Sequence, residues 1–225
     1  MDYNRFKNFY KELQKILPDL QIKFKDQSPF MKILGKILFF NKHFMTNFVT
    51  TIGSTVYFPN QEEVEKSTNG NQLIKLAHEY QHAKDCKFLG SFIFSFLYLF
   101  PQILFPILLL FCFWHWWILF LALIVISPLP AIFRKELEYR AYKVSLFCSY
   151  EISKELNVPE DSIRKTLQIR AAYYNEQFIS ANYYFMWPFG LEKKLAKDID
   201  SIMNGSAIKK NTTFKEIRTA LSNSK

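Results

Sequence analysis

The sequence predicts an α+β protein that is mainly helical, with a small sheet near its N-terminus and an inserted apolar helical hairpin. Three observations predict this class. Apolar residues recur at helical spacing in several segments. β-Branched and aromatic residues concentrate in short runs between residues 20 and 58, as is typical of strands. Residues 91–133 contain no Asp, Glu, Lys or Arg, although both flanking segments are rich in lysine and glutamate.

The first element is expected to be an amphipathic helix that ends before Pro18. Basic residues occupy much of its polar face, so the helix could cover one end of the domain or lie on a membrane surface. We expect it to cover the domain. Its apolar positions at helical spacing are Tyr3, Phe6, Tyr10, Leu13 and Leu17.

The segment that follows is expected to form the sheet. LQIKFK, KILFFN and FVTTIGSTVYFP predict two to four short strands, and Pro59 ends the last of them. Residues 60–71 are polar and are expected to form a loop.

The rest of the chain is expected to be helical apart from its end. A long helix should begin near Gln72, and further helices are predicted over residues 134–156, 161–178 and 191–203. The chain would then divide into four parts: residues 1–90 with the first helix, the sheet and the Gln72 helix; 91–133 with the hairpin; 134–203 with the remaining helices of the same domain; and 204–225 as a polar tail with at most a short helix at 214–221.

The composition limits the possible partners. The formal net charge is +9, but the basic residues are scattered and no helix-turn-helix or RNA-binding signature accompanies them. We therefore expect anionic lipid head groups, and not nucleic acid, to attract this charge. The three cysteines have no paired spacing, which argues against a disulfide framework. The N-terminus lacks the apolar core of a signal peptide, so no cleaved signal is expected.

The stretch HEYQH, residues 78–82, carries the most specific chemical signal. Residues i and i+4 share one face of a helix, so His78 and His82 can present ring nitrogens to one metal ion. Glu79 is offset from that face but near enough to take a proton from a metal-bound water. This is the logic of the H-E-x-x-H motif, in which two imidazoles hold zinc and the carboxylate is general base and then general acid.

A catalytic zinc ion needs a third protein ligand, and a carboxylate after the apolar run is the better choice. We expect His43 to be a surface or turn residue and His115, within FCFWHWW, to lie at a membrane interface. Glu136 and Glu138 are about 200° apart around a helix, so only one can face the ion. Glu136 can pair with Arg140, whereas Glu138 has small-residue space beside it and is the predicted ligand; both could also be solvated carboxylates.

This choice constrains the apolar run between the histidines and Glu138. If these residues meet at one ion, the chain must return to the side from which it left, so a membrane would be crossed an even number of times. Residues 91–133 can hold two spans of about 20 residues if the turn is tight, and the tryptophans near residues 111–117 suit an interfacial turn. Basic residues at both ends place the catalytic domain on the cytoplasmic side. A shallow re-entrant hairpin, or a soluble helical pair buried in a dimer, remains an alternative.

With these parts in place the sequence resembles the membrane-embedded gluzincin metallopeptidases of the HtpX and CAAX prenyl endopeptidase group. The shared order is HExxH on a helix, a polar step that here ends at Asp85, two apolar segments and a glutamate helix of the form E-x-x-A-D. The last motif reads EYRAY from residue 138, so Tyr142 stands where the family has Asp. The match covers roughly residues 76–145.

The resemblance implies a zincin-like domain that binds one Zn²⁺ through His78, His82 and Glu138, with Glu79 as catalytic acid and base. The expected function is therefore a membrane-associated zinc endopeptidase that acts on a protein or peptide. In such folds a sheet edge beside the histidine helix binds the substrate backbone, and FVTTIGSTVYFP is the candidate. Tyr183 or Tyr184 could stabilise the oxyanion or only pack in an aromatic cluster. The alternative function is a membrane-anchored binding or structural protein with a non-catalytic zinc site.

Overall fold

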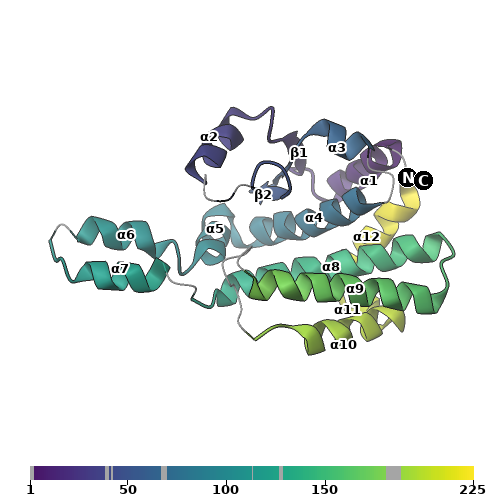
Figure 1. Ribbon diagram of the computed structural model, residues 1–225. Helices are drawn as coiled ribbons and strands as arrows, with labels where there is room; N and C mark the ends of the chain where they lie inside the picture. Colours follow the sequence, from purple (N-terminus) through teal and green to yellow (C-terminus); the bar gives the residue numbers. More distant parts are fainter. Residues whose placement is uncertain are drawn as a thin grey trace.

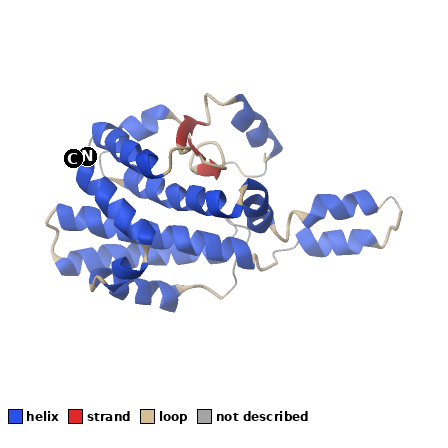
Figure 2. Ribbon diagram, turned by 180° about the vertical axis from the view of Figure 1, so that it is seen from behind, coloured by secondary structure: helices blue, strands red, loops and turns tan. Residues whose placement is uncertain are grey.

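The computed structural model describes residues 3–38, 41, 43–66, 70–112, 114–126, 129–180 and 189–225. The protein is mostly helical and has a three-stranded mixed sheet, which confirms the predicted α+β, mainly helical class (Figures 1 and 2). The elements are α1 (Tyr3–Ile16), β1 (Gln21–Phe24), α2 (Pro29–Ile37), β2 (Thr50–Ile52), β3 (Thr55–Phe58), α3 (Gln61–Lys66), α4 (Asn71–Leu89), α5 (Ser91–Leu99), α6 (Leu104–Phe111), α7 (Ile118–Ile126), α8 (Ile132–Glu155), α9 (Glu160–Ile179), α10 (Glu192–Met203), α11 (Ser206–Lys210) and α12 (Thr212–Asn223).

The sheet has the order β1-β3-β2, with β1 parallel and β2 antiparallel to the central strand β3. The stretch FVTTIGSTVYFP forms a hairpin, because Gly53 adopts a φ of 63° and turns the chain between β2 and β3. Only the β2 half of this stretch therefore lies at a sheet edge. The inward side chains of β3, Val56 and Phe58, are fully buried.

The core lies where α4 packs against α8, with α1 and α12 closing one end (Figure 1). Leu76 and Tyr80 of α4 and Leu146 and Phe147 of α8 are fully buried because each helix has neighbours on more than one side. The Phe147 ring stacks on Phe214 of α12 at a centroid distance of 4.3 Å. The segment expected to be a polar tail thus contains two helices, and the second of them is part of the main core.

Two local expectations for the N-terminal region were wrong. Within KILFFN, where a strand was predicted, Lys36 and Ile37 are the last residues of helix α2. Ser28 and Pro29 start this helix, because the Ser28 hydroxyl accepts a hydrogen bond from the Met31 amide at 3.3 Å and proline fits the first turn. The expected loop at residues 60–71 contains α3, whose start is capped by the Asn60 side chain on the Glu63 amide at 2.7 Å.

The apolar run 91–133 divides into a part that belongs to the body and a part that leaves it. Helix α5 packs against α4 and α8 through Phe94, which is 6 % exposed. Helices α6 and α7 lie side by side and project from one end of the body, and the chain reverses between them, within residues 112–117 (Figures 1 and 2). No single described helix has the length and apolar composition of a membrane span; α5 and α6 together reach both, but with a bend of 79° between them.

A buried lysine holds the turn at residues 43–47 against β1. Lys25 is fully buried, donates a hydrogen bond to the Phe44 carbonyl at 2.6 Å and lies 4.0 Å from the centre of the Phe44 ring. Burial lowers its pKa to about 8, although the Glu79 carboxylate opposes this shift. The ammonium is therefore held in a place that disfavours its charge.

We expect this lysine to make the free energy of unfolding rise with pH in the alkaline range. The folded chain releases the Lys25 proton at about pH 8, whereas the unfolded chain keeps it up to about 10.5, so the unfolded state binds more protons between these values. Relative to Lys25→Met, the wild type should gain on the order of 2 kcal/mol between about pH 7.5 and 9.5 in urea unfolding. A difference between the two proteins that does not change with pH would contradict the shifted pKa.

Candidate metal centre

Helices α4 and α8 bring the candidate metal ligands His78, His82 and Glu138 together. The two helices pack side by side in opposite directions (Figure 1). His82 therefore meets Glu138, while His78, one turn earlier on α4, meets Ser145 farther along α8. Two segments more than fifty residues apart in the chain thus converge on one point.

Three side chains in this place bring their nitrogen and oxygen atoms to the mutual distances of ligands to one ion. His78 Nε2 and His82 Nε2 are 3.2 Å apart, Glu138 Oε2 lies 3.3 Å from His78 Nε2, and Glu138 Oε1 lies 3.5 Å from His82 Nε2. Ligand atoms about 2.0–2.1 Å from a tetrahedral ion are about 3.3 Å from one another. The group formed by His78, His82 and Glu138 could therefore hold a metal ion, with a fourth position left for another ligand.

The burial of these side chains also favours a cation. Glu138 is 2 % exposed and its Oε2 atom has no hydrogen-bond partner in the described part of the chain. Burial alone raises the pKa of Glu138, but the His82 and His78 imidazoles outweigh it and hold that pKa well below its usual value. Burial alone lowers the pKa of His82, and the Glu138 carboxylate outweighs it and leaves that pKa raised. A buried carboxylate with one unpartnered oxygen fits a metal ligand.

A hydroxyl group orients one of the two imidazoles. His78 Nδ1 lies 3.2 Å from Ser145 Oγ, which in turn donates to the Ala141 carbonyl at 3.2 Å. An Nδ1–H that donates to Ser145 leaves Nε2 with its lone pair toward the metal position. Tyr142, which stands where the resembled family has Asp, instead packs its ring against His78 at a centroid distance of 4.7 Å. Ser145 is thus the polar partner of His78 Nδ1, while Nε2 faces Glu138.

A second hydroxyl group, which the sequence analysis missed, reaches the site from α5. Tyr98 donates a hydrogen bond to Glu138 Oε1 at 2.5 Å. The residue lies inside the uncharged run and was assigned with it to the membrane hairpin. The sequence signal for Tyr98 was weak, because the same apolar helix also carries the hydroxyl groups of Ser91 and Ser95.

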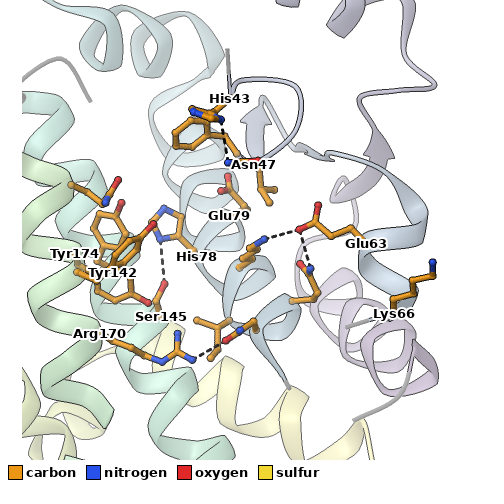
Figure 3. A pocket seen from close by; sticks show the side chains of 18 residues that line it. His43, Asn47, Glu63, Lys66, His78, Glu79, Tyr142, Ser145, Arg170 and Tyr174 are labelled. Atoms are coloured by element: carbon orange, nitrogen blue, oxygen red, sulfur yellow. Dashed lines mark hydrogen bonds and ion pairs between the residues drawn. The ribbon is translucent and has the colours of Figure 1, made fainter. Parts of the chain in front are cut away.

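Glu79 lies beside the group formed by His78, His82 and Glu138 and at the wall of a cavity. The Thr51 hydroxyl of edge strand β2 donates to Glu79 Oε2 at 2.7 Å, so the sheet fixes this carboxylate. The cavity has a volume of about 820 Å³ and is bounded by the turn at residues 43–47, α4, α8 and α9. Figure 3 shows His43 and Asn47 on one side of Glu79, with Tyr142 and Tyr174 beside His78. His78 and Glu79 therefore both face a space large enough for part of a substrate.

The other candidates from the sequence lie away from the ion position. Glu136 points toward α10, where Lys194 lies 3.8 Å away, and Arg140 pairs with Asp85 at 3.2 Å instead of with Glu136.

His43 is an exposed turn residue, as expected, but it also lines the cavity. His115 is exposed at the tip between α6 and α7. Tyr183 and Tyr184, the candidates for oxyanion stabilisation, lie outside the described residues.

Comparison of the chain with models of known protein families, with curated proteins and with solved structures gives no match.

Replacement of Glu138, the candidate carboxylate ligand, should weaken metal binding strongly. Glu138→Gln keeps the shape of the side chain but loses its charge, so we expect the dissociation constant for Zn²⁺ to rise more than about 100-fold in a chelator-competition titration. Glu136→Gln removes the same charge two residues away on the outer side of α8 and should leave the constant unchanged. Equal loss in both variants would show that Glu138 is no ligand.

Proposed function

We propose that this protein is a membrane-associated zinc endopeptidase with a zincin-like catalytic domain. The observation that carries the proposal is the buried pair of imidazoles and one carboxylate, with Glu79 beside it at the wall of a cavity. Two histidines and a glutamate that leave a fourth position for water are the ligand set of many zinc peptidases. Zinc bound there would polarise a peptide carbonyl and lower the pKa of a bound water.

The chain's own residues support the remaining steps. Glu79 takes the proton of the attacking water and passes it to the leaving amine, as general base and then general acid. Thr51 holds Glu79 Oε2 and so leaves Oε1 for the proton. A structural zinc site has no use for a carboxylate in this position, which favours catalysis over the alternative of a non-catalytic zinc site.

The sheet edge supports a peptide as the substrate. Among the described residues strand β2 pairs only with β3, and Thr51 ties it to the helix that carries the histidines. An extended peptide can add to such an edge through main-chain hydrogen bonds, which would lay its backbone along the cavity next to Glu79. This arrangement supports the resemblance to gluzincins of the HtpX and CAAX prenyl endopeptidase group.

Removal of the general base should abolish hydrolysis without loss of the metal. We expect Glu79→Gln to retain stoichiometric Zn²⁺ while cleavage of a fluorescently labelled unfolded protein falls by about 100-fold or more. The Glu136→Gln protein serves as the matched control and should cleave at the wild-type rate. Undiminished cleavage by Glu79→Gln, or a wild type that binds no Zn²⁺, would sink the proposal.

The projecting helices support a lipid membrane as the partner of this enzyme. Along α6, the tip and α7, large apolar side chains are exposed: Ile107, Leu110, Phe111, Trp114, Trp116, Trp117, Leu119, Phe120, Leu123 and Ile124. Helix α2, at the same end of the body (Figures 1 and 2), exposes Phe30, Ile33 and Ile37 and carries two lysines suited to anionic head groups.

We propose that the hairpin inserts into the membrane from the cytoplasmic side. Helices of eight or nine residues, each about 12–14 Å long, favour a re-entrant insertion over two full spans.

A charge on the hairpin should weaken membrane binding. Leu110 on α6 is 64 % exposed, and Leu156, at the far end of α8, is 62 % exposed. Insertion of Leu110→Glu into the acyl region is costly, so its partition coefficient into phosphatidylserine-containing vesicles should fall by about tenfold or more, while that of Leu156→Glu should stay near the wild type. Equal partition of the two variants in flotation assays would rule out hairpin insertion.

A further inference from the structure

The hydrogen bond from Tyr98 makes the two oxygens of Glu138 unequal. Oε1 accepts the Tyr98 hydroxyl at 2.5 Å and lies 3.5 Å from His82 Nε2, whereas Oε2 is buried without a hydrogen-bond partner among the described residues and lies 3.3 Å from His78 Nε2. A carboxylate can bind a metal through one oxygen or through both. A strong donor on Oε1 leaves Oε2 as the oxygen that faces the metal position.

Tyr98 lies behind the metal group and not in the substrate cavity. Its ring stacks with Phe94 at a centroid distance of 5.9 Å, and both rings lie 6.1 Å from the His82 ring. The described residues that line the cavity include His78 and Glu79 but not Tyr98. Tyr98 therefore acts on the ligands and does not touch the substrate.

The base of the apolar hairpin fixes the position of Tyr98. Arg134, where the chain returns to the body, donates through Nε to the Tyr98 carbonyl at 2.7 Å and lies 5.1 Å from the centre of its ring. The same guanidinium donates to the Gln102 side chain at 3.4 Å. Phe100 and Phe133 add a ring contact at 6.0 Å between the outgoing and returning chain. The two ends of the hairpin are thus clamped together at Tyr98.

We propose that Tyr98 is a positioning residue for Glu138, and that the Arg134 clamp makes the metal affinity depend on the closed base of the hairpin. The inference rests on the proposed metal centre. It gives residues of the apolar run a defined task, because the segment that meets the membrane also sets the geometry of a ligand. A change at the hairpin base is then transmitted to Glu138 through one hydroxyl group.

Tyr98→Phe tests the first part, since it removes only the hydroxyl. The dissociation constant of the 225-residue protein for Zn²⁺ should rise by about 10- to 100-fold. With Oε1 released to bind as well, the visible absorption of the Co²⁺-substituted protein should shift from that of a four-coordinate to that of a five-coordinate ion. Tyr139→Phe is the matched control, because it removes another tyrosine–carboxylate hydrogen bond, to Asp198, from the residue next to Glu138. Wild-type affinity and spectrum in Tyr98→Phe would overturn the assignment.

A double-mutant cycle with Arg134→Met tests the clamp. If Arg134 acts through Tyr98, Arg134→Met should weaken Zn²⁺ binding several-fold in the wild type but by less than about twofold in Tyr98→Phe. The same loss in both backgrounds would refute the coupling. These readouts measure metal binding and not cleavage, so they are separate from the peptidase test. If the wild type binds Zn²⁺ and Tyr98→Phe binds it with the same affinity, only this inference is refuted. If the wild type binds no Zn²⁺, the proposed metal centre is refuted as well.

Discussion

The contact of a buried carboxylate with two imidazoles is the interaction on which the rest of the structure depends. Glu138 is almost inaccessible to water, and an isolated negative charge in such a place is strongly unfavourable. The imidazoles favour the charged form of this carboxylate: they hold the pKa of Glu138 well below its usual value, and Glu138 leaves the pKa of His82 raised, in both cases against the effect of burial. A divalent cation would supply more charge and satisfy Oε2 as well, so the chain is preorganised for one.

This interaction determines how the chain must run. The histidines and Glu138 lie on antiparallel helices, so the segment between them has to leave and return at the same end of the body (Figure 1). Its first helix, α5, forms a wall of the metal group through Phe94 and Tyr98, and only α6 and α7 project. The first part of the apolar run therefore belongs to the proposed catalytic domain, and the second part forms the proposed surface for lipid.

The sequence predicted those features that depend on local spacing. The helix with His78 and His82 follows from an i,i+4 pair, and the choice of Glu138 over Glu136 follows from the faces of one helix. Tyr98 could not be predicted, because its role depends on the turn at Gly90, after which the apolar helix α5 packs against α8. The end of helix α2 was predicted to be part of a strand in KILFFN, because the helix is encoded by the cap at Ser28, well before that apolar stretch.

The central claim is that two imidazoles and one carboxylate hold a single zinc ion. X-ray absorption spectroscopy at the zinc K-edge of the loaded wild-type protein tests it most directly, because it reports ligand types and distances together. The account predicts a four-coordinate first shell of nitrogen and oxygen at about 2.0 Å with the multiple-scattering signature of two imidazoles. A shell of six oxygens without imidazole, or sulfur at about 2.3 Å, would contradict it.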